Sequence, residues 1–175
     1  MTPSKEKGFR YIKLTQGYRT LVDVDDYERL NKHKWYCQIH RTNGVITHLT
    51  AQRSVKTNGK GSIVLMHREI IDAGNLFVDH INGNFLDNRK CNLRAVTTSQ
   101  NAMNKQRSRM KTSSRYKGVK KESRWKLKNK WSANIGVGGK KIYLGLFRTE
   151  KDAALAYNQA ALTHFGSFSR LNLIK

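Results

Sequence analysis

The sequence predicts an α+β protein, and three patterns along the chain support this fold class. Residues 9–65 alternate apolar and polar side chains and contain turn signals such as Asn43-Gly44, which is typical of small antiparallel sheets. Residues 76–104 indicate two short strands that are joined by a long loop and followed by a helix. Residues 116–161 predict three further strands and then a helix rich in alanine.

The N-terminal region, residues 1–65, is expected to be mainly β-structure. A turn is predicted at Gln16-Gly17, and a second one at residues 58–61. Asp25 can cap a short helix over residues 26–32. Strands are expected near residues 11–14, 21–24, 35–39 and 63–66.

A second region, residues 66–106, carries the strand, loop, strand and helix pattern. A short helix is expected at 67–71, a strand at 76–81 and a second strand at 93–97. Thr98 or Ser99 can cap the helix that follows.

The last 60 residues form a third region, which a basic linker at 107–114 separates from the second. Residues 115–175 predict strands at 116–120, 131–137 and 141–147, and a helix that begins at Thr149. Period-two alternation places the side chains of Trp131, Ala133, Ile135, Val137, Ile142 and Leu144 toward this helix, and those of Lys130, Ser132, Asn134, Gly136, Lys141 and Tyr143 on the opposite face.

The charge of the chain predicts a polyanionic partner. Thirty-four Lys and Arg residues against 12 Asp and Glu residues give a net charge of +22. The excess is uneven, because residues 1–110 hold 19 basic and 9 acidic side chains and residues 111–175 hold 15 and 3. Basic side chains gain affinity for nucleic acid by releasing counterions from phosphates. No segment reaches the ~18 apolar residues of a membrane span, so double-stranded DNA is the expected partner.

The compartment and the assembly are predicted from weaker signals. Cys37 and Cys91 are isolated from each other and form no CxxC pair, which gives no indication of a disulfide framework or a thiolate zinc site. The N-terminus lacks the apolar stretch of a signal peptide. We therefore expect the protein to work in a reducing cytoplasm. One candidate active site per chain favours a monomer, and a dimer on a palindromic site is the alternative.

Four polar residues carry the candidate chemistry. Asp79 and His80 are adjacent at the end of an apolar run, and Asn92 and Asn101 follow. Phosphodiester hydrolysis needs an activated water and compensation of the phosphate charge. A carboxylate can help to hold a divalent cation for the second task. A neutral histidine can accept the proton of the water, and an amide oxygen can fix its tautomer.

In this segment the chain resembles the HNH endonucleases, specifically the phage and intron-encoded homing group. The resemblance covers His67-Arg68, Val78-Asp79-His80-Ile81-Asn82-Gly83-Asn84, Leu86-Asp87-Asn88, Asn92-Leu93-Arg94 and Gln100-Asn101.

The resemblance implies a ββα-metal fold and a metal-dependent DNA endonuclease that hydrolyses phosphodiester bonds. By position, Asp79 and Asn101 would be metal ligands, His80 the general base, and Asn92 the residue that orients His80. An asparagine at the last motif position favours oxygen ligation, and therefore Mg²⁺ or Mn²⁺ over Zn²⁺. His67 would either position the site or pack at a sheet edge.

Residues of the third region resemble the APETALA/ethylene-response-factor domain. The resemblance covers residues 116–120, 131–135, 143–147 and 153–157, with Gly166 and Leu171-Asn172 at its end. It implies three antiparallel strands on one helix, with the sheet face in the major groove of DNA. The implied DNA contacts are Lys117, Lys120, Arg124, Trp125, Lys130, Asn134, Lys141 and Tyr143.

This chain departs from the plant pattern at several of these contacts. Lys117, Lys120 and Lys141 stand where the plant domain has arginine, and Asn134 stands where it has an acidic residue. Lysine is a point charge that lacks the two-pronged geometry with which arginine reads guanine, so looser sequence discrimination is expected.

Two other functions remain compatible with the sequence. One is a DNA-binding regulator with an inactive nuclease core, and the other is a basic RNA-binding or ribosome-associated protein. The asparagines at 82, 84, 88 and 92 also have a purely structural interpretation, because asparagine is common in turns.

Overall fold

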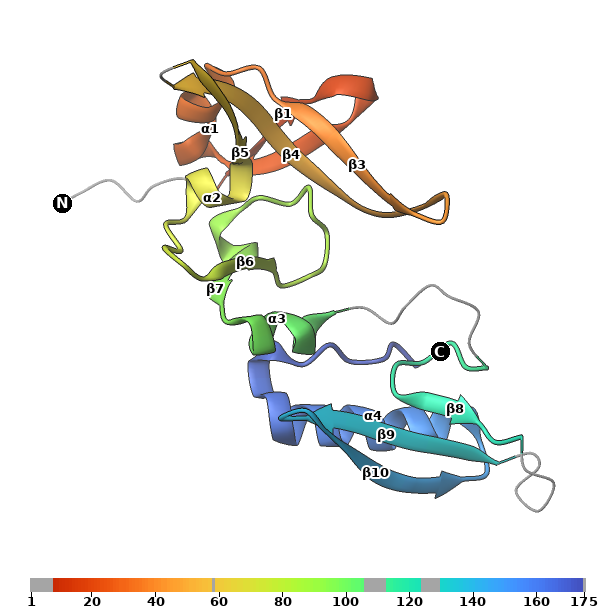
Figure 1. Ribbon diagram of the computed structural model, residues 1–175. Coiled ribbons are helices and arrows are strands. Elements are labelled where there is room, and N and C mark those ends of the chain that lie inside the picture. The colour runs from red at the N-terminus through yellow and green to blue at the C-terminus, as the bar shows by residue number, and fades with distance from the viewer. Residues whose placement is uncertain (1–7, 58, 106–112, 124–129, 175) are drawn as a thin grey trace. The chain divides into compact units, whose positions relative to one another are not determined.

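A computed structural model describes residues 8–57, 59–105, 113–123 and 130–174 of the chain. Within these residues, helices combine with small antiparallel sheets, so the predicted α+β class is confirmed (Figure 1). The chain forms two compact units, residues 1–97 and residues 98–175. Their boundary falls inside the span 66–106 that the sequence assigned to one nuclease core. Most of the predicted linker, residues 106–112, lies outside the described residues.

The first unit begins with an antiparallel hairpin of β1 (Phe9–Lys13) and β2 (Arg19–Asp23). The hairpin turn contains Gln16 and Gly17, both of which adopt positive φ angles, in agreement with the turn predicted there. Helix α1 (Val24–Asn31) follows directly and buries Leu30 completely. It starts one residue before Asp25, so the predicted helix is confirmed with a shifted beginning.

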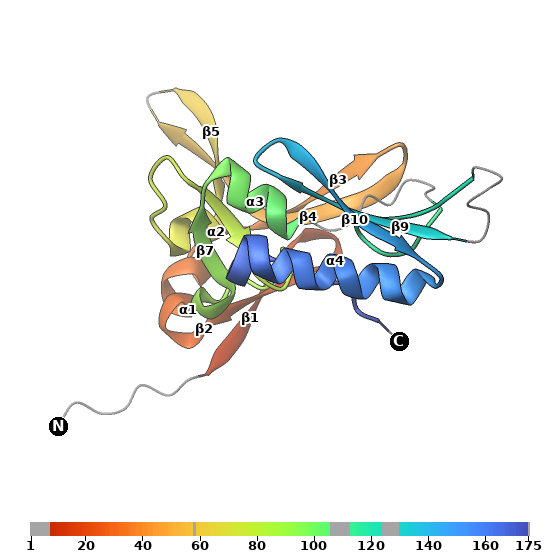
Figure 2. The same ribbon diagram turned by 90° about the horizontal axis from the view of Figure 1, so that it is seen from below.

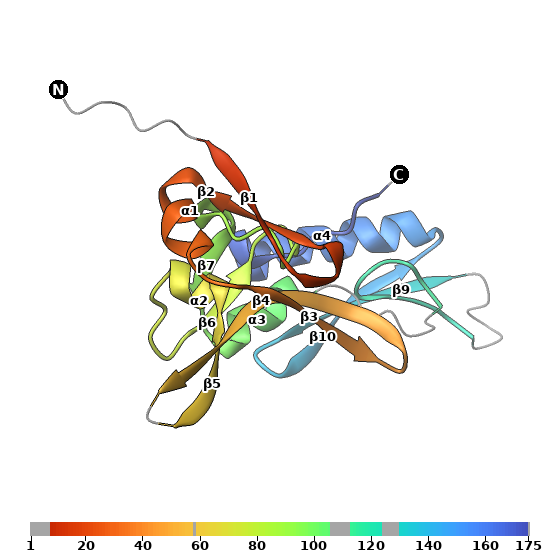
Figure 3. The same cartoon turned by 90° about the horizontal axis from the view of Figure 1, so that it is seen from above.

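A three-stranded antiparallel sheet follows, with the strand order β3 (Tyr36–Thr42), β4 (Val45–Thr57) and β5 (Lys60–Leu65). Strands β3 and β4 form a long hairpin (Figure 3). Its turn is Asn43-Gly44, and both residues have positive φ angles of 50° and 76°. Two consecutive residues in this conformation match the right-handed twist of the strands, which is why the Asn-Gly pair predicted the hairpin correctly.

The first unit ends with a short helix and a further hairpin. Helix α2 (Met66–Ile70) leads to β6 (Phe77–His80), which pairs with β7 (Leu93–Val96) in an antiparallel sheet. The loop between these strands contains η2 (Lys90–Asn92). One apolar core joins β1, β2, α1, the large sheet and α2, and it includes the buried residues Ile12, Val22, Leu30, Trp35, Cys37, Ala51, Met66 and Leu93.

The second unit contains α3 (Thr98–Asn104) and the predicted three strands on one helix. The sheet order is β10 (Lys140–Phe147), β9 (Trp131–Val137) and β8 (Val119–Lys121), and all pairs are antiparallel. Helix α4 (Glu150–Phe165) lies along this sheet (Figure 2), and η4 (Gly166–Phe168) follows it. The elements of the expected ββα-metal core are thus present in order. Because α3 belongs to the second unit, the ββα-metal arrangement itself stays a prediction.

Helix α4 packs closely on the sheet because three alanines lie on its buried face, beside Tyr157 and Phe165. Thr149 caps the helix by accepting a hydrogen bond from the backbone N–H of Asp152, as the sequence predicted. Ala153, Ala154 and Ala161 are completely buried. They contact the inner side chains of the sheet, which are Trp131, Ala133, Ile135, Val137 and Leu144 as predicted. Ile142, which was expected to face inward, is exposed, and β10 contains a bulge between Tyr143 and Gly145.

No helix in the described part of the chain has the length and apolar character that crossing a membrane requires.

Gly118 provides a test of the packing between helix α4 and the sheet of the second unit. Its φ angle is +76°, and a Cβ atom there would overlap the ring of Tyr157 and lie 2.6 Å from the carbonyl oxygen of Asn134. We expect Gly118→Ala to lower the free energy of unfolding by about 3 kcal/mol or more. Gly139→Ala is the matched control, because Gly139 has a φ angle of +78° with open space around it. The control should cost only about 1–2 kcal/mol. Urea unfolding followed by tryptophan fluorescence measures both, and equal losses would contradict the packing.

Candidate active site

Asp79 and His80 are the last two residues of β6, where the small β6–β7 hairpin meets its long loop. Both are buried, with 8% and 2% of their surfaces exposed. Asp79 lies directly opposite Arg94 of β7. Two guanidinium nitrogens of Arg94 donate to Oδ2 of Asp79, at 3.0 and 2.9 Å. The pair compensates the carboxylate charge, which would be costly to bury alone.

The imidazole of His80 is held by Asn88. Its Nε2 lies 3.0 Å from Oδ1 of Asn88, and Nδ2 of Asn88 donates to Oγ1 of Thr20 at 2.8 Å. The sequence assigned the orienting role to Asn92, and the structure gives this hydrogen bond to Asn88 instead. A series of hydrogen bonds therefore connects His80, through Asn88 of the loop, to Thr20 of strand β2.

The side-chain amide of Asn92 binds two backbone groups of the loop between β6 and β7. Its Oδ1 accepts from the backbone N–H of Asn82 at 2.9 Å, and its Nδ2 donates to the carbonyl of Asp87 at 2.8 Å. Both bonds are to backbone groups within residues 81–92. Asn92 thus fixes the loop that carries Asn88, and its effect on His80 is indirect.

Further hydrogen bonds from charged and polar side chains stabilise the loop at residues 81–92. Arg89 donates two hydrogen bonds to the carboxylate of Asp87, at 2.8 and 2.7 Å, and these bonds hold the pKa of Asp87 below its usual value. Asn82 and Asn84 each accept a hydrogen bond from a backbone N–H two residues later. The structural interpretation of these two asparagines as turn formers is therefore correct.

His67 of α2 packs against the ring of His80. The two rings are perpendicular, and their centroids lie 5.3 Å apart. Burial, with smaller contributions from the neighbouring His80 and Arg68, lowers the pKa of His67 to about 4. Burial also lowers the pKa of His80, although Asn88, Asp79 and Asp87 act in the opposite direction. Both rings are therefore neutral near pH 7, and His67 is a packed neighbour of the candidate base.

An aromatic row continues from His80 to the β3–β4 hairpin. The ring of Phe85 lies 5.4 Å from that of His80 and 5.2 Å from that of His48, between centroids. His48 stacks on His40 at 4.0 Å. Sequence reasoning could place no partners for His40 and His48. Their position directly across from each other on β3 and β4 depends on the register of this hairpin.

The oxygen donors of the two expected ligands, a carboxylate and an amide, are of the type that Mg²⁺ and Mn²⁺ prefer. Among the described residues, no group of three His, Cys, Asp or Glu side chains comes close enough to hold a metal ion. A carboxylate such as Asp79 suits Mg²⁺ or Mn²⁺, which keep several waters and need few protein ligands. Asn101 lies on α3, in the second unit. The joint role of Asp79 and Asn101 as metal ligands therefore stays a prediction.

The outer face of the second unit's sheet presents several of the predicted DNA contacts. Lys120, Lys141 and Tyr143 are exposed on β8 and β10, and Asn134 lies opposite Tyr143. Lys130, just before β9, is also exposed. Arg124 and Trp125 lie outside the described residues. The face is basic and polar with one large aromatic side chain, which is suited to phosphates and base edges.

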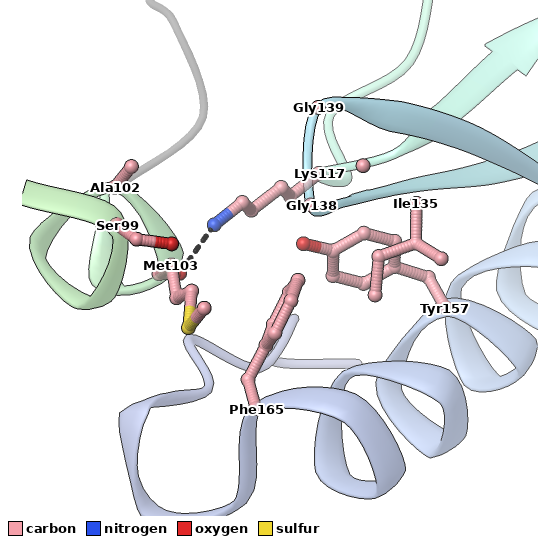
Figure 4. Close-up of a pocket in the computed structure, with 10 residues that line it drawn as sticks. Ser99, Ala102, Met103, Lys117, Ile135, Gly138, Gly139, Tyr157 and Phe165 are labelled. Carbon is pink, nitrogen blue, oxygen red and sulfur yellow. Dashed lines mark hydrogen bonds between the residues drawn. The ribbon is translucent and has the colours of Figure 1, made fainter.

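Lys117 does not belong to this face. Its Nζ donates to the carbonyl oxygens of Met103 and Lys105, both at 2.8 Å, at the C-terminal end of α3 (Figure 4). Burial lowers its pKa to about 8. Met103 also packs beside Ile135, Tyr157 and Phe165. In this structure the ammonium of Lys117 thus anchors α3 to the second unit, and the DNA contact of Lys117 stays a prediction.

A cavity of about 220 Å³ lies beside this anchor, within the second unit. Figure 4 shows Tyr157 and Phe165 of α4 and the Gly138-Gly139 turn around it. Burial raises the pKa of Tyr157 to about 12, so its hydroxyl stays protonated at neutral pH.

Comparisons with known proteins agree with the chemistry of the first site. Residues 64–103 match the family model described as HNH endonuclease. The chain is 29% identical over 169 residues to a protein named as an HNH endonuclease from Acanthamoeba polyphaga mimivirus, and the match covers 95% of this chain and 81% of that protein. Residues 64–103 are thus similar to HNH endonucleases, which points to a nuclease.

A second similarity is partial. The chain is 43% identical over 60 residues to dehydration-responsive element-binding protein 2C of Arabidopsis thaliana. This match covers 33% of the chain and 16% of the plant protein.

The buried His67 predicts a specific loss of stability in acid. An unfolded histidine binds a proton near pH 6.5, whereas His67 stays neutral down to about pH 4. Between these values the unfolded state binds more protons, so the free energy of unfolding falls as the pH falls, by about 3 kcal/mol at most. We expect His67→Phe to remove this part of the pH dependence.

Urea unfolding between pH 4.5 and 7.5, in the presence of chelator, measures this effect. His33→Phe is the control, because His33 is exposed in the same unit. An unchanged slope in His67→Phe would contradict the neutral, buried state of His67.

Proposed function

We propose that the protein is a metal-dependent DNA endonuclease in which His80 removes the proton from the attacking water. The observation that carries this proposal is the state of His80: a buried imidazole with a lowered pKa, held by Asn88 and adjacent to the carboxylate of Asp79. A neutral histidine can accept the proton of an attacking water, which is the role of a general base in phosphodiester hydrolysis. The HNH similarity of residues 64–103 supports the same reaction class.

The hydrogen bonds of Asn88 favour one of the two ring nitrogens of His80 as the proposed base. Nδ2 of Asn88 donates to Thr20, so the amide oxygen faces Nε2 of His80. An oxygen can only accept, and Nε2 must therefore carry the proton of the neutral ring. The lone pair is then on Nδ1, which we assign as the atom that takes the proton from water.

Asp79 and Asn101 would hold Mg²⁺ or Mn²⁺ in this proposal. When bound, the cation would neutralise charge on the scissile phosphate and stabilise the leaving oxygen. Arg94 fixes the orientation of the Asp79 carboxylate through its two hydrogen bonds. Asn92 and Asp87 hold the loop from which Asn88 reaches His80.

The second unit would bind double-stranded DNA through the outer face of its sheet. Lys120, Lys130 and Lys141 would contact phosphates, and Asn134 and Tyr143 would face the bases. The net charge of +22 and the partial similarity to a plant element-binding protein support this role. We propose a homing-type enzyme that works as a monomer in a bacterial cytoplasm and nicks or cuts its target.

A second candidate function is a DNA-binding regulator with an inactive nuclease core. The observation in its favour is the ion pair between Arg94 and Asp79, because a guanidinium on a metal ligand competes with the cation. Supercoiled plasmid incubated with Mg²⁺ or with chelator separates the two functions, since a regulator would bind the plasmid and leave it uncut.

The role of His80 predicts a loss of rate without a loss of binding. We expect His80→Ala to nick supercoiled plasmid 10²- to 10⁴-fold more slowly, roughly the contribution of a general base. The dissociation constant for DNA should stay within about twofold of the wild-type value, because the base acts on water. His33→Ala, at an exposed site of the same unit, should cleave normally. Cleavage by His80→Ala at the wild-type rate would exclude His80 as the base.

The role of the sheet face predicts a change in the salt dependence of binding. Each phosphate contact contributes roughly −0.9 to the slope of log K against log salt concentration. Lys141→Ala should therefore reduce the slope by about 0.9. Lys151→Ala removes the same charge from an exposed position on α4 and should leave the slope unchanged. Filter binding at several salt concentrations measures both, and equal slopes in the two variants would count against the face.

A further inference from the structure

A buried chain of hydrogen bonds connects the N-terminal hairpin to the candidate base. Oγ1 of Thr20, on β2, donates to the carbonyl oxygen of Leu86 at 2.8 Å and accepts from Nδ2 of Asn88 at 2.8 Å. Oδ1 of Asn88 then lies 3.0 Å from Nε2 of His80. Thr20 and Asn88 are 0% and 1% exposed, so water does not compete for these bonds.

The direction of each bond follows from the first one. A backbone carbonyl is an acceptor only, so the single hydroxyl proton of Thr20 is used on Leu86. The oxygen of Thr20 can then only accept from Asn88, which requires that the amide nitrogen of Asn88 faces Thr20. The amide oxygen is left for His80. The opposite orientation of Asn88 would take the hydroxyl proton away from Leu86 and lose one buried hydrogen bond.

We propose that Thr20 is a positioning residue for the nuclease reaction, because it fixes the Asn88 amide and through it the Nε2–H tautomer of His80. This inference rests on the proposed function only where it concerns rate. The effect on the tautomer is a property of the folded protein.

The backbone of β2 supports the same arrangement. The N–H of Leu21 donates to the carbonyl of Leu86, and the N–H of Asn88 donates to the carbonyl of Leu21, both at 2.8 Å. Strand β2 thus binds the loop on both sides of Asp87. Thr20 is held in register with Asn88 by these bonds. The N-terminal hairpin therefore acts directly on the geometry of the candidate base.

Three substitutions separate this role from simple packing. Thr20→Ser keeps the hydroxyl and loses a methyl group, Thr20→Val keeps the shape and loses the hydroxyl, and Thr20→Ala loses both. If the hydroxyl fixes the tautomer, Ser should resemble the wild type, and Val and Ala should lower kcat by roughly five- to thirtyfold with KM for DNA unchanged. If Thr20 only fills space, Val should resemble the wild type and Ser should be impaired, which would overturn the proposal.

A spectroscopic measurement tests the tautomer without any cleavage. Nitrogen NMR of ¹⁵N-histidine-labelled, metal-free full-length protein distinguishes Nε2–H from Nδ1–H in the His80 ring. We expect one tautomer in the wild type and Thr20→Ser, and a mixture in Thr20→Ala, so the Ser and Ala pair decides the matter even if Thr20→Val fails to fold. An identical tautomer in Ser and Ala would refute the role of Thr20. If the wild type cleaves no DNA, the nuclease proposal fails while these spectra still decide the tautomer.

Discussion

The buried imidazole of His80 is the constraint on which the rest of the site depends. A ring that is 2% exposed cannot rely on water for its hydrogen bonds, so the protein must supply them. Asn88 supplies the bond to Nε2, and Asn88 in turn needs Thr20. Each of these groups is buried, and each fixes the orientation of the next. The position of the candidate base therefore requires an ordered loop and a strand from a distant part of the sequence.

The boundary between the two units follows from the contacts that hold the loop after β6 and helix α3. The loop after β6 is tied to β2, which makes the N-terminal hairpin and the β6–β7 hairpin one unit. Helix α3 is tied by Lys117 and Met103 to the sheet and helix of the second unit.

Local sequence signals predicted the elements well and their partners poorly. The Asn43-Gly44 turn, the Thr149 cap and the inward-facing side chains of β9 depend on neighbouring residues, and these three predictions are confirmed. Ser132, which was expected on the outer face, is buried. The partner of His80 could not be chosen in this way. Asn88 and Asn92 lie in the same loop, and only the path of the folded loop decides that Asn88 reaches the ring and Asn92 reaches backbone groups. Thr20 and Lys117 act on residues whose proximity the sequence does not reveal.

In the proposed enzyme, the side chains of the cleavage site are buried, whereas those that would bind DNA are exposed. This difference affects how strictly each unit would discriminate. His80, Asn88 and Thr20 are buried and have little conformational freedom, which favours one reaction geometry. Lys120, Lys130 and Lys141 are exposed, flexible point charges, which gain affinity from any phosphate and discriminate weakly among bases. A target with altered bases would keep most of the phosphate contacts while the cutting geometry stays the same. The proposed enzyme could therefore act on targets that differ in base sequence, while the geometry of the cleavage reaction would vary very little.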